Sequence, residues 1–131
     1  MVAATDRDAV AFSLSSGEAG DAPQGRLLLM ALGDVNHKTH LLMDRAYEGD
    51  ETRALAESLG YDPVVPPKSN RKEPWAYDKE LYKKRNQVER LFRRIKRFRR
   101  VFTRYDKLDT MFRAFILLAL IIDSLLYVNR P

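Results

Sequence analysis

The chain holds two short apolar runs separated by a helical pattern. Thr39–Met43 has the length of a strand, and Val64-Val65 forms a second apolar segment that Pro66-Pro67 stops. Between them, Gly49-Asp50 marks the start of a helix over Glu51–Leu59. This order of strand, loop, helix and strand predicts an α/β domain in which helices pack on a sheet.

A hairpin is predicted before this unit. Val10, Phe12 and Leu14 alternate with small or polar residues, and a turn over Thr5–Asp8 connects them to a short strand at Val2–Ala4. A loop over 16–24 leads to a short helix over 25–32, which ends at Gly33. Because the chain starts inside a hairpin, we expect an upstream strand of the domain to be missing.

Two long helices are predicted in the second half, over Asp78–Arg100 and Asp106–Val128. The unbroken apolar stretch Ala114–Ile122 has nine residues, whereas a membrane span needs about 20, so we interpret it as a core helix. At 131 residues, the chain suits one globular domain with one core. The predicted fold is therefore a few-stranded sheet followed by two long carboxyl-terminal helices.

Charge divides the chain at its middle. Residues 1–66 contain 5 Lys+Arg and 11 Asp+Glu, whereas residues 67–131 contain 18 and 7. Between Lys83 and Arg104, eleven of 22 residues are basic and Glu89 is the one acid. Such a stretch favours a polyanion such as DNA or RNA, and a solvated basic helix face is the alternative. The absence of cysteine and of a secretory signal favours the cytoplasm.

Four polar residues fall together on a helical wheel of the basic helix, beside its apolar stripe. They are Tyr82, Arg85, Glu89 and Lys96. A carboxylate flanked by cations and a phenol could bind a hard divalent metal while its neighbours hold phosphate oxygens. The alternative for Glu89 is a surface salt bridge to Arg85 or Arg93.

Asp44 is the second candidate acid, because it follows an apolar strand and precedes a loop and a helix. Ligands in open α/β sheets gather beyond the carboxyl ends of strands. The alternative is a turn or a side-chain capping role for Asp44 within Asp44–Tyr47. Together, Asp44 and Glu89 could supply oxygen ligands to Mg²⁺ for an in-line phosphoryl transfer.

Four segments resemble the carboxyl half of DDE transposases from bacterial insertion sequences. They are Leu42–Tyr47, Pro66–Arg71, Tyr82–Lys96 and Thr103–Lys107. The family signature Y-x-x-R-x-x-x-E-x-x-x-x-x-x-K is met at Tyr82, Arg85, Glu89 and Lys96 without a spacing error.

The resemblance implies an incomplete ribonuclease-H-like fold, with Asp44 and Glu89 as the second and third acids of a catalytic triad. In that family the triad holds two Mg²⁺ (or Mn²⁺) ions, which serve DNA strand cleavage and strand transfer. The DNA partners are the terminal repeats of the element and the target DNA, held by a homodimer on paired ends. The expected location is the cytoplasm, in association with the nucleoid, without a membrane. The DNA-contacting residues are expected to be Tyr82, Arg85, Arg93, Lys96, Lys68 and Arg71.

The family's first Asp lies on a strand ahead of the hairpin, and no residue here takes its place. We therefore expect residues 1–131 to be one carboxyl-terminal part of a transposase catalytic domain, inactive unless the upstream segment completes it. The alternatives are a non-catalytic nucleic-acid-binding remnant and a membrane-surface protein.

Three further residues have weaker claims to a function. His37 and His40 make a poor transition-metal site without Cys or a third His, so a surface or packing role is favoured. Trp75 could stack on an unpaired base, but a role in covering the core is favoured.

Overall fold

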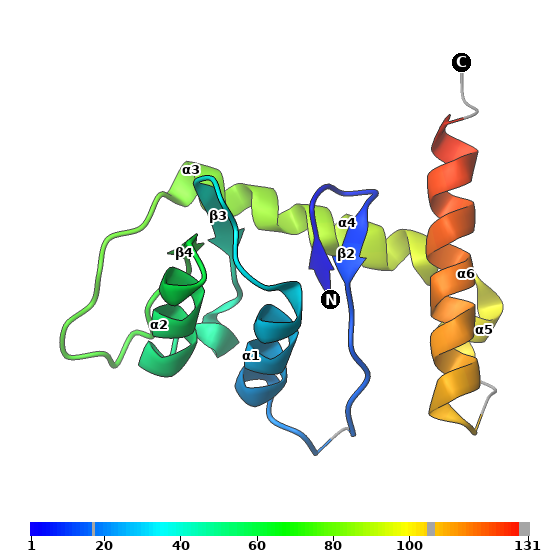
Figure 1. Ribbon diagram of the computed structural model, residues 1–131, viewed down its shortest axis with the longest axis horizontal. Coiled ribbons are helices and arrows are strands. Elements are labelled where there is room, and N and C mark those ends of the chain that lie inside the picture. Colours follow the sequence, from blue (N-terminus) through cyan, green and yellow to red (C-terminus); the bar gives the residue numbers. More distant parts are fainter. Residues whose placement is uncertain (17, 105–106, 129–131) are drawn as a thin grey trace. The chain divides into compact units, whose positions relative to one another are not determined.

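A computed structural model describes residues 1–16, 18–104 and 107–128 of the chain (Figure 1). The chain forms two compact units, each with its own small core. One unit is continuous, Ser15–Arg85, and the other combines Met1–Leu14 with Asn86–Pro131.

The continuous unit contains the predicted strand–helix–strand segment. Its elements are α1 (Asp21–Leu32), β3 (Thr39–Leu42), η1 (Arg45–Tyr47), α2 (Asp50–Ser58), β4 (Tyr61–Val64), α3 (Lys79–Tyr82) and η2 (Lys83–Arg85). Strands β3 and β4 pair in parallel, with Thr39 opposite Tyr61 and Leu42 opposite Val64. The Met43 N–H continues the ladder by donating to the Val64 carbonyl at 3.0 Å.

Buried apolar side chains from α1, α2, β4 and the residues directly after β3 and β4 form the core of this unit. They are Leu29, Met43, Ala56, Val64 and Val65. Helix α1 begins at Asp21, inside the predicted loop over 16–24. The early start is physically reasonable, because Pro23 is tolerated in a first helical turn and the Asp21 charge suits a helix amino terminus.

The other unit begins with the predicted hairpin. Strands β1 (Val2–Ala3) and β2 (Ala9–Ala11) pair antiparallel. The Thr5 hydroxyl stabilises the turn, since it donates to the Asp8 carboxylate at 2.7 Å and accepts from the Arg7 and Asp8 N–H groups. The remaining elements are α4 (Asn86–Ile95), α5 (Arg99–Thr103) and α6 (Asp109–Val128).

Leu91, Ile95 and Ala119 form the centre of this second core. Beside them, Arg94 connects α6 with the hairpin turn: its Nε donates to Asp123 at 2.9 Å, and its Nη1 lies 3.6 Å from Asp6. Arg94 and Asp123 are mostly buried, so this pair is only weakly screened by solvent.

The prediction of one continuous helix over Asp78–Arg100 is wrong. A 3₁₀ turn, η2, separates α3 from α4, and α4 ends at Ile95 before a turn leads to α5. Like charges four residues apart, such as Lys96 and Arg100, disfavour a continuous helix there. The strands likewise form two separate pairs in the described chain, where one sheet was expected.

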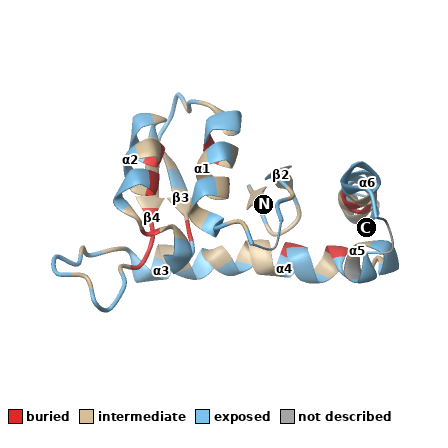
Figure 2. Ribbon diagram, turned by 90° about the horizontal axis from the view of Figure 1, so that it is seen from below, coloured by how far each residue is buried: buried red, intermediate tan, exposed pale blue. Residues whose placement is uncertain are grey.

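Helix α6 differs from the expected core helix, because only Ile116 and Ala119 of its residues are buried. Its exposed apolar residues include Met111, Leu118, Ile121, Leu125 and Val128, and Figure 2 shows most of α6 in the exposed class. The helix continues past Asp123, whose carboxylate pairs with Arg94. In the described part of the chain, α6 is long and apolar enough to cross a membrane by length and composition. Its predicted start at Asp106 lies outside the described residues.

Replacing Gly25 by alanine should destabilise the continuous unit. A Cβ at Gly25 in α1 would lie 2.5 Å and 2.8 Å from two ring atoms of Tyr47. Alanine normally stabilises a helix by about 1 kcal/mol relative to glycine, but overpacking costs about 1–3 kcal/mol. We expect Gly25→Ala to lower the free energy of unfolding, measured by urea denaturation followed through Trp75 fluorescence.

The double variant Gly25→Ala/Tyr47→Ala is the control, because it removes the ring that Gly25→Ala alone would strike. The alanine at position 25 should then be neutral or stabilising relative to Tyr47→Ala. A more stable Gly25→Ala single variant would show that the Tyr47 ring does not occupy this position.

Candidate functional site

Asp44 lies directly after β3, at the amino end of η1. Its backbone carbonyl accepts the Tyr47 N–H at 2.9 Å, but its side chain makes no capping hydrogen bond. The carboxylate instead lies 3.4 Å from Nη1 of Arg85, and 55% of the side chain is exposed. The structure therefore shows the local turn at Asp44, closed by the backbone carbonyl, without a cap from the side chain.

Arg85 and Tyr82 complete this cluster from the opposite end of the unit. The Arg85 guanidinium lies 5.7 Å from the centroid of the Tyr82 ring, and Tyr77 meets that ring edge to face at 5.6 Å. Burial raises the pKa of the Tyr82 phenol above its usual value; the charge of Arg85 opposes this and that of Asp44 adds to it. The phenol is therefore protonated at neutral pH and able to donate a hydrogen bond. The structure brings together Asp44, Tyr82 and Arg85.

Glu89, Arg93 and Lys96 belong to the other unit. Glu89 is half-buried in α4, Arg93 is exposed on the same helix, and Lys96 is exposed one residue beyond its end. The juxtaposition of Glu89 with Asp44 stays a prediction.

The described residues contain no cluster of three or more His, Cys, Asp or Glu side chains that could hold a metal ion. Asp44 offers one exposed, hard oxygen donor of the kind that Mg²⁺ prefers. A complete site needs further carboxylates. His40 lies on the surface with Nδ1 3.0 Å from Asp62 on the neighbouring strand, consistent with the surface role predicted for it.

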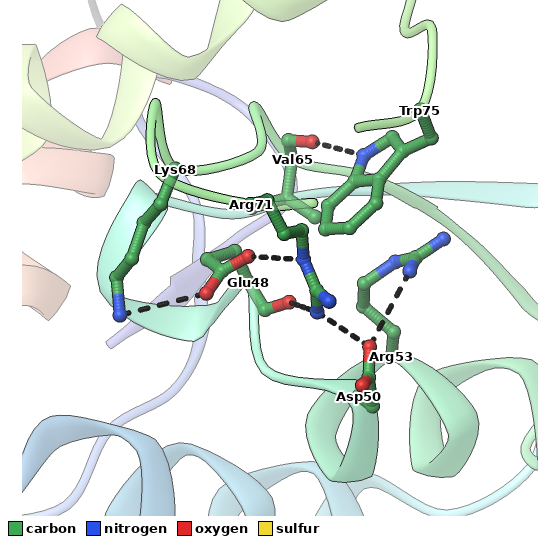
Figure 3. A network of polar contacts seen from close by, with 7 residues as sticks. All are labelled: Glu48, Asp50, Arg53, Val65, Lys68, Arg71 and Trp75. Carbon is green, nitrogen blue, oxygen red and sulfur yellow. Dashed lines mark hydrogen bonds and ion pairs between the residues drawn. The ribbon is translucent and has the colours of Figure 1, made fainter. Parts of the chain in front are cut away.

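A charged network surrounds Glu48, which sequence reasoning missed (Figure 3). Arg71 donates from Nε to the Glu48 carboxylate at 2.9 Å and from Nη2 to the Glu48 carbonyl at 3.4 Å and to Asp50 at 2.5 Å. Lys68 lies 3.5 Å from the other Glu48 oxygen. Glu48 is 7% exposed. Because 23 residues separate Glu48 from Arg71, no local pattern could have identified this pair.

Trp75 closes the network, and its contacts favour the structural role over base stacking. Its indole N–H donates to the Val65 carbonyl at 2.8 Å. The Arg53 and Arg71 guanidinium groups lie over the ring, 3.7 Å and 4.6 Å from its centroid. Residues 48–50, 68 and 70–73 line an open hollow beside these contacts.

The pKa of Glu48 lies below its usual value. Burial alone would raise it, but the hydrogen bonds and charges of Arg71 and Lys68 outweigh that effect. The ion pair therefore stabilises the fold fully above the unfolded pKa, which is about 4.3. This contribution is lost as the pH falls through the lower, folded-state pKa.

Glu48→Gln should lower the free energy of unfolding by about 1–3 kcal/mol at pH 7, because the Arg71 fork loses its charged acceptor. The difference from wild type should shrink as the pH falls below the unfolded pKa, because protonation removes the charge on which the ion pair depends. Urea denaturation at pH 7, 5 and 3, followed by Trp75 fluorescence, measures this. Glu57→Gln on the exposed face of α2 is the control. An equal loss of unfolding free energy at all three pH values would show that the charge of the Glu48 carboxylate does not stabilise the fold.

Comparison with known proteins identifies relatives of the chain. Residues 1–123 match the family described as the transposase DDE domain. Over 104 residues the chain is 36% identical to a protein of Brucella ovis named as a transposase for insertion sequence element IS6501, and the alignment covers 79% of this chain and 78% of that protein. No solved structure matches the chain. The chain therefore belongs to the DDE transposase family of insertion sequences.

Proposed function

We propose that the chain binds DNA and contributes Asp44 and Glu89 to metal-dependent strand cleavage and strand transfer within a ribonuclease-H-like fold. The observation that carries this proposal is the cluster of Asp44, Tyr82 and Arg85. The sequence separates Asp44 from the other two by about 40 residues, and the fold of one unit brings them into contact.

The chemistry of the cluster suits a phosphodiester. A DNA phosphate that approaches Asp44 meets the Arg85 guanidinium, whose donors match phosphate oxygens. The protonated Tyr82 phenol can donate a further hydrogen bond to the same backbone. Asp44 and Glu89 are the carboxylates that would hold Mg²⁺ or Mn²⁺. When bound, these ions supply positive charge that activates the attacking hydroxyl and stabilises the leaving oxygen.

The basic segment of the other unit supports a DNA partner. Arg93 and Lys96 are exposed, as are most cations between them and Arg104. Such side chains neutralise phosphates and release condensed counterions, which gives affinity with little sequence preference.

A second candidate function is DNA binding without cleavage. It is favoured by one observation: the described ranges place no three metal-ligating side chains together. The two functions share the basic surface and differ in whether Asp44 is needed for a chemical step.

In a chain extended by the upstream segment expected above, Asp44→Asn should reduce metal-dependent nicking of an element end by more than about 100-fold, because it removes a metal ligand. DNA affinity should remain within about twofold. A supercoiled plasmid that carries the element end, incubated with Mg²⁺ or Mn²⁺, measures the nicking. Fluorescence anisotropy with a labelled duplex measures the binding.

Asp62→Asn provides the matched control, because Asp62 is an exposed acid of the same unit that pairs with His40. It should nick at the wild-type rate. DNA binding without nicking in either metal, by the extended chain that keeps Asp44, would favour the second function. Equal nicking by Asp44→Asn and wild type would contradict the role of Asp44.

Lys96→Gln should lower the slope of log affinity against log salt concentration by about 0.9, as expected for one lost phosphate contact on duplex DNA. Lys38→Gln makes the same change of charge at an exposed lysine outside the basic segment, and it should leave the slope unchanged. Equal slopes for Lys96→Gln and wild type would remove Lys96 from the DNA interface.

A further inference from the structure

The loop over residues 66–74 is held at its base and at its middle. The Trp75 indole donates to the carbonyl of Val65, which joins the two ends of the loop. Arg71, within the loop, reaches Glu48 and Asp50 on the segment before α2 (Figure 3). A surface loop with joined ends and internal side-chain contacts is an Ω-loop, a type that frequently carries function.

The donors and the flat face of Arg71 are engaged by groups of the protein itself. Nε and Nη2 donate to Glu48 and Asp50, and the guanidinium lies over the Trp75 ring. Hydrogen bonds to Asp50 and Glu48 also raise the pKa of Arg71 above its already high usual value. A guanidinium engaged by two carboxylates is poorly placed to neutralise a phosphate. These partners therefore favour a structural role for Arg71 over the DNA contact predicted for it.

The lysines of the loop are directed differently. Lys72 is exposed, and no ion pair joins it to the residues that the structure describes. Lys68 is 54% exposed on its side chain, although its ammonium lies 3.5 Å from Glu48. Both lysines are within four residues of Arg71, so their positions depend on where Arg71 is held.

We propose that Glu48, Asp50 and Arg71 form a clamp that positions this loop, so that Lys68 and Lys72 contact the DNA backbone. The inference rests on the proposed DNA-binding function. In it, Arg71 and the two acids are positioning residues and the two lysines make the phosphate contacts. The clamp predicts an effect of the Glu48 charge on DNA affinity that is opposite to the one expected from charge repulsion. Removing the negative charge of Glu48 should weaken the binding of a polyanion, whereas simple charge repulsion predicts stronger binding.

The test compares Glu48→Gln with Glu57→Gln, which makes the same change of charge at an exposed site on α2. Affinity for a 30-base-pair duplex is measured by fluorescence anisotropy over a range of salt concentrations, with the full chain. Glu48→Gln should bind about 3–10-fold more weakly than wild type at 0.15 M salt. Its salt slope should fall by up to about 1.8, because two phosphate contacts are lost. Glu57→Gln should bind as tightly as wild type or slightly more tightly.

A double-mutant cycle separates positioning from a general loss of structure. Lys72→Gln should lower the salt slope by about 0.9 in the wild-type background and should have little effect in the Glu48→Gln background. Arg71→Lys keeps the charge but loses the fork, so it should behave as Glu48→Gln does. Asp50→Asn, which leaves the buried acid in place, repeats the test if Glu48→Gln does not fold.

The outcomes are distinct. Binding by folded Glu48→Gln that equals or exceeds that of Glu57→Gln would overturn the clamp, and so would an equal effect of Lys72→Gln in both backgrounds. No duplex binding by the wild-type chain would overturn the proposed function itself, and the inference with it.

Discussion

Pairing of β3 with β4 is the constraint on which the rest of the continuous unit depends. Two parallel strands need a crossover, and here η1 and α2 provide it within 18 residues. The crossover starts at the carboxyl end of β3, so Asp44 is placed at a strand end and Glu48 is buried at the start of the connection. The Asp44 cluster and the Glu48 network therefore both include residues of the connection between β3 and β4.

The two sites use arginine in opposite ways. Arg85 lies beside an acid that is more than half exposed, where a phosphate can reach both groups. Arg71 lies against a buried acid and an aromatic ring, where its fork connects segments far apart in the sequence. Composition assigns both to a basic surface. Under the proposed function, burial of the partner carboxylate separates a residue that contacts DNA from one that positions a loop. A high content of basic residues therefore does not by itself identify the cations that meet DNA.

Particular residues show how far sequence patterns reach. The hairpin turn at Thr5–Asp8, the strand before Asp44 and the helix start at Gly49 rest on local signals, and the structure confirms them. The prediction of a continuous helix over Asp78–Arg100 was wrong. The spacing of apolar residues contains no information about repulsion between nearby cations or about a 3₁₀ turn. The Glu48–Arg71 pair was missed because contacts over 23 residues leave no periodic signal.

The sequence by itself determined the short strands, the start of the helix after Gly49, the basic segment and the spacing of Tyr82, Arg85, Glu89 and Lys96, because each depends on neighbours within a few residues. The match to the transposase DDE domain rests on the same information. Tertiary structure alone decided that Asp44 pairs with Arg85, that Arg71 is engaged by Glu48 and Asp50, and that α6 exposes most of its apolar side chains. Burial and long-range ion pairs decide these features, since they arise only when segments distant in sequence pack together.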